Sequence, residues 1–258
     1  MVMGRWDKGL ILIFDLDDTL MWTEYLYSLA FLEYSKLLIE IFQRRLPYIG
    51  SIAKRSEEIS HDKIKEINLA TGQPYGFSMN RYPDTLVASY KELCDNGFGT
   101  YDEKIAAQIR NIGMMVFDGV KIEEAGLVPG AENTLSLLRR KAYLILVTKG
   151  DKEVQEIKIK ALNLERWFSE IRIVSNKTKE SFLEFRERFP DSLVYSIGNS
   201  FSSDIKSALD AGLAGIFIPC YTWKAESIDY SSLTPEQLRN FIRLKKIEEL
   251  PAVFSDII

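Results

Sequence analysis

The sequence has few of the side chains that form disulfides or bind transition metals. Its 258 residues include two cysteines and one histidine. Cys94 and Cys220 lie far apart and follow no metal-ligand spacing, so we expect free thiols in a reducing compartment rather than a disulfide or a zinc site. His61 lies among charged residues, and we expect it to be solvated.

Long apolar runs and an excess of positive charge are also absent. The first apolar run, residues 10–14, is short and ends in aspartates, which fits neither a secretory signal nor a membrane span. A formal charge of −4 and a pI near 5.3 give no general attraction for nucleic acids or anionic membranes. We therefore expect a cytoplasmic protein that binds neither, and any phosphate-bearing ligand must bind at a local site.

The composition, 46% hydrophobic and 27% charged, is that of a globular protein, long enough for one large domain or a domain with an insertion. Continuous apolar runs predict strands that are covered on both faces, as in the middle of a parallel sheet. They are residues 10–14, 143–148, 171–174, 193–198 and 214–219. The last four are separated by stretches of helical spacing or length, which predicts βαβ units.

The region between the first and second runs breaks this alternation. Residues 24–46, 82–96 and 102–117 place apolar side chains at helical intervals, and no comparable strand run lies among them. We therefore predict an α/β fold, a Rossmann-like parallel sheet core with an inserted all-helical cap domain. The core comprises residues 1–22 and 122–258, and the cap comprises residues 23–121.

Polar side chains gather where the predicted strands end. In an open parallel sheet, ligands bind at the carboxyl ends of the strands, because the loops there converge on one crevice. Carboxylates, a hydroxyl and an ammonium at these ends indicate a site for phosphate and magnesium. The residues are Asp15, Asp17 and Thr19 after the first run, Thr148 and Lys149 at the second, Lys177 beyond the third, and Asn199 and Asp204 after the fourth.

The order of these residues resembles the haloacid dehalogenase superfamily of hydrolases. The resemblance consists of D-x-D-x-T at residues 15–19, a strand ending in Thr148, then Lys177, then G-N-x4-D at residues 198–204. It covers about residues 8–22 and 122–220. The motif at residues 15–19 is specific to the family, whereas Thr148 and Lys177 support the resemblance only through their order in the sequence.

The resemblance implies an aspartyl-phosphate mechanism. Asp15 would be the nucleophile, and Asp17 would protonate the leaving oxygen and later deprotonate the attacking water. Mg²⁺ would offset the repulsion among the carboxylates. Its ligands would be an Asp15 oxygen, the Asp17 backbone carbonyl, and Asp204 or Asn199; Asn199 stands where the family often has Asp, which leaves open which of the two binds the metal.

The remaining site residues would bind the phosphoryl group or the substrate. Thr148 would donate its hydroxyl to phosphoryl oxygens, and Lys177 would neutralise charge on the phosphate and on Asp15. Lys177 is preferred to Lys179 because "KTKESF" matches the family's Lys-Thr spacing before a helix. Lys149 and Trp22 are further candidates for contact with the substrate.

Two nearby residues have simpler interpretations. We expect Asp18 to be a turn residue and Thr19 to form hydrogen bonds within the loop. Asp204 and Asn199 could instead serve only to cap a helix.

The sequence therefore predicts a magnesium-dependent phosphoric monoester hydrolase that acts on a small phosphorylated metabolite. A phosphomutase or dehalogenase of the same superfamily, or a non-catalytic binding protein, remains an alternative. Asp17 argues against a dehalogenase, which needs no acid at that position, whereas Asn199 favours a binding protein. The sequence gives neither the physiological substrate nor the oligomeric state.

Overall fold

The computed structural model describes residues 9–220 and 229–255. The chain divides into two compact units. The first comprises Met1–Glu24, Ala125–Gln155 and Leu162–Ile258, and the second comprises Tyr25–Glu124 and Glu156–Ala161.

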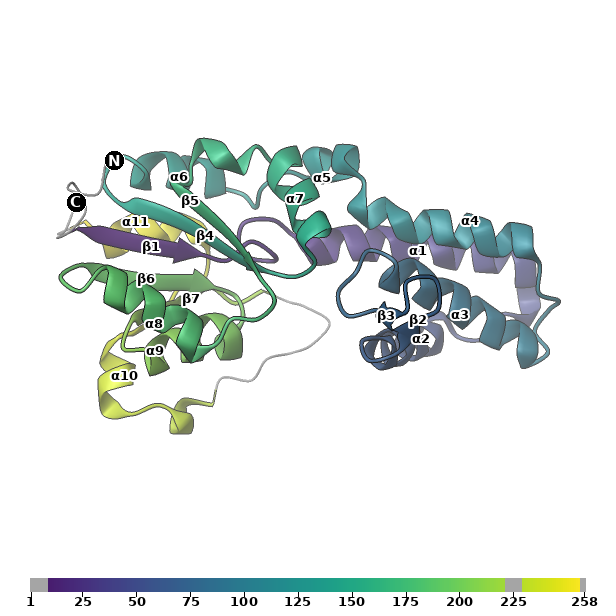
Figure 1. Ribbon diagram of the computed structural model, residues 1–258. Coiled ribbons are helices and arrows are strands. Elements are labelled where there is room, and N and C mark those ends of the chain that lie inside the picture. Colours follow the sequence, from purple (N-terminus) through teal and green to yellow (C-terminus); the bar gives the residue numbers. More distant parts are fainter. Residues whose placement is uncertain (1–8, 221–228, 256–258) are drawn as a thin grey trace. The chain divides into compact units, whose positions relative to one another are not determined.

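A six-stranded sheet forms the centre of the first unit (Figure 1). Its strand order is β5-β4-β1-β6-β7-β8, and every neighbouring pair is parallel. The strands are β1 (Leu10–Phe14), β4 (Tyr143–Lys149), β5 (Glu170–Val174), β6 (Leu193–Gly198), β7 (Ala214–Phe217) and β8 (Phe241–Arg243). The five predicted strands are confirmed, and β8 is an additional edge strand that the apolar runs did not predict.

Strand β1 lies in the middle of the sheet and is buried along its whole length, as its continuous apolar run predicts. On one face, Ile11 and Ile13 belong to a core cluster with Phe182 and Phe185 of α8 (Lys179–Arg188). Helices lie on both faces of the sheet (Figure 1), so apolar side chains that alternate in direction along β1 are all covered.

This unit also contains α6 (Ala131–Leu138), the first turn of α7 (Lys152–Ala161), α9 (Ser207–Asp210), α10 (Pro235–Arg239) and α11 (Leu250–Val253). The predicted helix start before Pro235 is confirmed, because Thr234 and Gln237 form a capping box. The helix that follows is short, however, and β8 begins at Phe241. A π-helical turn, Phe201–Lys206, precedes α9.

The second unit contains most of α1 (Thr23–Phe42) and all of α2 (Ile49–Lys63), α3 (Arg81–Asp95), α4 (Glu103–Met114) and α5 (Gly119–Ala125, except its last residue). Its apolar core is formed by side chains of α1 to α4, such as Leu38, Ile52, Tyr90 and Ile109. The prediction of an entirely helical region was wrong in one detail. A short antiparallel hairpin, β2 (Ile67–Asn68) with β3 (Gln73–Pro74), lies between α2 and α3.

The structure also bears on the state of the two cysteines and on the length and hydrophobicity of the helices. Among the described residues, Cys94 and Cys220 form no disulfide. Within residues 9–220 and 229–255, none of the helices has the length and apolar character needed to cross a bilayer.

Candidate active site

Asp15 lies immediately after β1, at the carboxyl end of the central strand. Its backbone N–H donates to the Ile197 carbonyl at 2.9 Å, which extends the pairing of β1 with β6 by one residue. The Asp15 side chain is 10% exposed. The end of the strand therefore fixes a carboxylate where water has little access.

The loop after Asp15 is a tight turn fixed by backbone hydrogen bonds. The N–H groups of Leu20 and Met21 both donate to the Leu16 carbonyl, at 2.9 and 3.2 Å. Asp18 has φ +57°, in the left-handed region, and its side chain accepts from the Glu24 N–H at 3.1 Å. Asp18 is thus a turn residue, as predicted, because Asp tolerates this conformation and bonds to nearby backbone.

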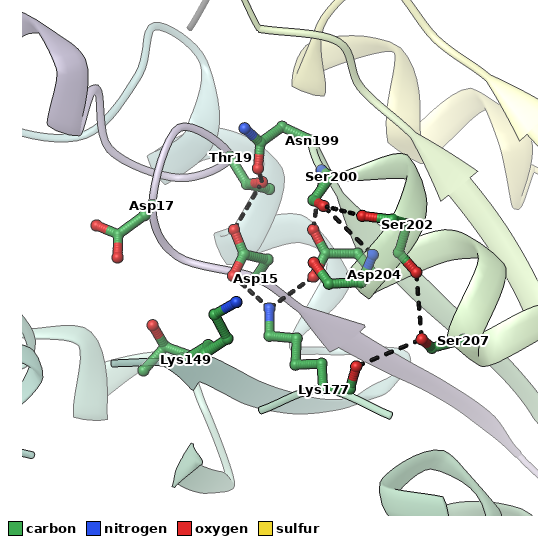
Figure 2. A network of polar contacts seen from close by, with 12 residues as sticks. Asp15, Asp17, Thr19, Lys149, Lys177, Asn199, Ser200, Ser202, Asp204 and Ser207 are labelled. Carbon is green, nitrogen blue, oxygen red and sulfur yellow. Dashed lines mark hydrogen bonds and ion pairs between the residues drawn. The ribbon is translucent and has the colours of Figure 1, made fainter. Parts of the chain in front are cut away.

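Lys177 joins two buried carboxylates (Figure 2). Its ammonium donates to Asp15 Oδ1 and, at 2.7 Å, to Asp204 Oδ1. All three side chains are at most 10% exposed. Lys179 is instead the first residue of α8, whose N-cap Thr178 forms a capping box with Ser181.

The charges of this cluster shift the pKa values of Asp15 and Lys177. Burial raises the pKa of Asp15 to about 7, an effect that Lys177 partly offsets and that Asp204 and Asp17 reinforce. Burial alone would lower the pKa of Lys177, but attraction to Asp15 and Asp204 outweighs it and raises that pKa. Lys177 therefore stays charged, while Asp15 is poised to titrate near neutral pH.

The end of β6 provides the second half of this cluster. Asn199 Oδ1 and Asp15 Oδ2 share the Thr19 hydroxyl as donor, at 3.2 and 3.1 Å. Asp204 lies in the π-helical turn, where its Oδ2 accepts from the Ser200 N–H at 3.0 Å. Ser200, not Asn199 or Asp204, is the N-cap residue of this turn.

Gly198, at the end of β6, leaves room for the Asp204 side chain to pack against the strand. A methyl group at its Cα would lie 2.6 Å from the Asp204 Cβ and 2.5 Å from its Cγ. Real Cβ atoms do not approach other carbons this closely, so a larger residue would displace Asp204. The glycine allows Asp204 to lie directly against the end of β6.

Asp17 lies beside this cluster with its carboxylate turned away from that of Asp15 (Figure 2). Its Oδ1 accepts from the Thr23 hydroxyl, and its Oδ2 accepts from Gln155 Nε2 at 3.0 Å. Gln155 also accepts from the Thr148 hydroxyl, at 3.1 Å. The structure thus links Asp17 to Thr148 through a residue that the sequence motifs do not include.

The other residues that the sequence analysis named differ in environment. Thr148 is fully buried, whereas Trp22 is 50% exposed. Lys149 ends β4, and its side chain extends toward Asp15 in Figure 2. His61 is exposed on α2, as expected.

The donors at the strand ends suit a hard divalent cation. Two carboxylates and one amide oxygen, from Asp15, Asp204 and Asn199, face one another, and oxygen is the ligand that Mg²⁺ prefers. A pKa of about 7 for Asp15 means that ionising this carboxylate in the buried site is costly, and a cation would lower that cost. Within the described residues, no group of three or more His, Cys, Asp or Glu side chains could hold a metal. Any magnesium site would therefore need the Asn199 amide, backbone or water as further ligands.

Comparison with known proteins identifies the family. Residues 11–212, more than half of the chain, match the haloacid dehalogenase-like hydrolases. N-acylneuraminate-9-phosphatase of Mus musculus is 24% identical over 95% of this chain and 93% of its own length. A haloacid dehalogenase-like hydrolase from Xanthomonas campestris has the same fold, with a TM-score of 0.67, 18% identity and coverage of 97% of this chain and 96% of that one. The magnesium-bound YfnB of Bacillus subtilis aligns with a TM-score of 0.57 and 21% identity, over 96% and 99% of the two chains. The chain belongs to the haloacid dehalogenase-like hydrolase family.

Proposed function

We propose that this hydrolase is a magnesium-dependent phosphatase that acts on a small phosphomonoester through an aspartyl-phosphate on Asp15. The observation that carries the proposal is the buried cluster of Asp15, Lys177 and Asp204 at the carboxyl end of the sheet. A carboxylate beside a fixed ammonium can accept a phosphoryl group while the ammonium stabilises the added charge. The similarity to a named phosphatase supports this choice among hydrolases.

Asp15 would act as the nucleophile. One of its carboxylate oxygens attacks phosphorus, a new O–P bond forms, and the bond to the ester oxygen breaks with its electron pair on that oxygen. Lys177 donates to Asp15 and lies where it can neutralise charge on the phosphoryl oxygens. Water then attacks the aspartyl-phosphate and releases phosphate and the free carboxylate.

Asp17 would hold and move the proton. Its carboxyl protonates the departing ester oxygen and then takes a proton from the attacking water. In-line attack places the ester oxygen on the side of phosphorus opposite Asp15. The role therefore does not require the Asp17 carboxylate to face Asp15, and the orientation in Figure 2 is compatible with it.

Magnesium would be held by Asp15, Asp204 and the Asn199 amide oxygen, together with the Asp17 backbone carbonyl that the family resemblance implies. When bound, it would supply positive charge that offsets the repulsion between these carboxylates and the phosphate. Thr148 would donate to a phosphoryl oxygen only after its hydroxyl leaves Gln155, its acceptor in this structure. Lys149 and Trp22 are proposed substrate contacts.

The helical region, residues 23–121, is proposed to act as a cap on a core formed by residues 1–22 and 122–258. A cap of this size would exclude macromolecular phosphates, so the substrate would be a small metabolite. The net charge of −4 supports the absence of nucleic acid binding, and the two thiols outside any disulfide support a reducing, cytoplasmic location.

Asn199 favours a second candidate, a binding protein that keeps the fold without turnover. Its amide can accept the Thr19 hydrogen bond and coordinate a cation, but it contributes no charge to the site. A dehalogenase is less well supported, because it would leave the buried network around Asp17 without a chemical role.

Hydrolysis of 4-nitrophenyl phosphate in Mg²⁺ tests the proposal. We expect activity that is lost on addition of EDTA and lost in Asp15→Asn. Asp18→Asn is the matched control, because it changes the same functional group three residues away, and Asn also tolerates the left-handed conformation. The binding protein would be favoured if the wild type hydrolyses neither this ester nor any of a panel of sugar phosphates, nucleotides, phosphoglycolate and N-acylneuraminate 9-phosphate.

A further inference from the structure

Gln155 is a buried amide in the first turn of α7, and the sequence motifs assign it no role. It is 3% exposed and lies between the end of β4 and the loop that follows β1. Its two polar atoms make three hydrogen bonds: to Asp17 at 3.0 Å, to Thr148 at 3.1 Å and to the Lys149 carbonyl at 3.3 Å. A buried glutamine with every partner inside the candidate site has a positional role there.

The hydrogen-bond partners fix the orientation of this amide. Nε2 faces the Asp17 carboxylate and the Lys149 carbonyl, both of which can only accept. The opposite orientation would place Oε1 against two acceptors, so Oε1 must face Thr148, whose hydroxyl donates to it. Gly150 leaves room for this arrangement, because a Cβ there would lie 2.7 Å from Nε2.

The same amide restrains Asp17. Thr23 holds one carboxylate oxygen and Gln155 holds the other, so the side chain is fixed at both ends of the carboxylate. Removal of Gln155 would release Oδ2 from this restraint, and the terminal torsion of the Asp17 side chain is intrinsically soft.

We infer that Gln155 is a positioning residue that sets the orientation of the Asp17 carboxyl group relative to the end of β4. This inference rests on the proposed function, in which Asp17 gives its proton to the leaving oxygen. Gln155 itself touches neither the phosphoryl group nor the leaving group. Its contribution is to keep the acid in one orientation, since small displacements of a catalytic group reduce the rate strongly.

Two esters of nearly equal shape separate positioning from a merely structural role. In 4-nitrophenyl phosphate the leaving oxygen departs as a stable anion and hardly needs a proton, whereas in phenyl phosphate it needs one from Asp17. In both, the P–O bond breaks with its electron pair on the phenolic oxygen. A misplaced acid should therefore lower kcat/KM, which covers the steps up to departure of the leaving group, only for the phenyl ester, because general acid catalysis contributes about 10²- to 10⁴-fold where protonation is required. Deprotonation of water by Asp17 comes after that departure and affects both esters equally, in kcat alone.

We expect Gln155→Leu to lower kcat/KM for phenyl phosphate by about 10- to 100-fold and for 4-nitrophenyl phosphate by less than about threefold. Glu153→Leu, at an exposed position of the same helix, is the control and should leave both values unchanged. Gln155→Glu keeps the size of the side chain but replaces the donor to Asp17 with a carboxylate oxygen. It should show the same selective loss, which keeps the test available if the leucine variant does not fold.

A double-mutant cycle completes the test. In an Asp17→Asn background, Gln155→Leu should cause no further selective loss on phenyl phosphate, because the group that it positions is gone. Equal slowing of both esters, or no slowing of either, in an otherwise active enzyme would overturn the inference and leave the proposed function intact. A wild type that hydrolyses neither these esters nor any member of the substrate panel above in Mg²⁺ would reject the proposed function, and the inference with it. If the wild type accepts only a member of that panel, its alkyl ester replaces phenyl phosphate, because an alkoxide leaving group also needs the proton from Asp17; an unchanged kcat/KM in Gln155→Leu would then overturn the inference.

Discussion

Replacing Asp15 with Asn should change the pH dependence of folding in metal-free protein. Burial raises the pKa of Asp15 from 3.8 to about 7, so the native state binds this proton more tightly than the unfolded chain does. Between these two pKa values the native state holds more protons than the unfolded state. The contribution of Asp15 to the free energy of unfolding must therefore fall as the pH rises from about 4 to about 7.

The pKa shift of Asp15 gives the size of this change in stability. A shift of about 3 pKa units corresponds to about 4 kcal/mol, because each unit is worth about 1.4 kcal/mol. Part of this is already lost at pH 5, so the wild type should lose about 2 to 3 kcal/mol between pH 5 and pH 8 through this group. The asparagine of the variant would not titrate, and its side chain can keep the same partners. Its Oδ1 can accept from Lys177, while its Nδ2 donates to the Thr19 hydroxyl, which then donates only to Asn199.

Urea unfolding in EDTA at pH 5 and pH 8 measures the effect. We expect the stability of Asp15→Asn relative to the wild type to increase by about 2 to 3 kcal/mol between the two pH values. Ile13→Val, an uncharged change within β1, is the control, and its cost should be the same at both. Equal differences at pH 5 and pH 8 for Asp15→Asn would show that Lys177 fully compensates the burial of this carboxylate and would refute the reasoning.

The other residues of the cluster give two further predictions. Gly198→Ala should displace Asp204, lower the free energy of unfolding in urea by about 1 to 3 kcal/mol and abolish magnesium-dependent activity. Gly119→Ala is the control and should have none of these effects, because nothing lies within 4 Å of the added Cβ. Lys177→Met should destabilise the protein by about 3 to 5 kcal/mol at pH 8, because it leaves two buried carboxylates without their cation. The loss of stability caused by Lys177→Met should become smaller as the pH falls and Asp15 is protonated. A loss that is independent of pH would contradict this account.

The strands of the core could be predicted because their signal is local. A run such as residues 10–14 is apolar throughout, and the structure buries every one of its side chains. Strand β8 has only three residues, is partly exposed, and directly follows a capped helix, so no pattern distinguishes it from a continuation of that helix. The hairpin of β2 and β3 has two residues in each strand, which is too short for a period of two to appear.

The candidate site could be predicted in part because topology brings strand ends together. Parallel pairing places the carboxyl ends of β1, β4 and β6 at one edge, so residues 15, 148 and 199 had to lie near one another. Gln155 could not be found in this way. It lies in a helix, within the polar stretch KEVQEIKIK, where a glutamine is typical of a solvated face. Only the packing of the first turn of α7 beside the end of β4 shows that it is buried.

The charges of the cluster show what a bound cation would contribute under the proposed function. Asp15 and Asp204 share one ammonium, which leaves a formal charge of −1 when both carboxylates are ionised. A phosphoryl dianion would be repelled by that charge, and at neutral pH the Asp15 carboxylate would be protonated in a large fraction of molecules and so unable to attack. A bound dication would bring the sum to +1, which attracts the substrate, and would lower the pKa of Asp15, which supplies the nucleophile. An aspartate at position 199 would reduce that sum to zero. Under the proposed function, the asparagine present there would therefore bind the metal less tightly than an aspartate but would leave a more positive site for the phosphate.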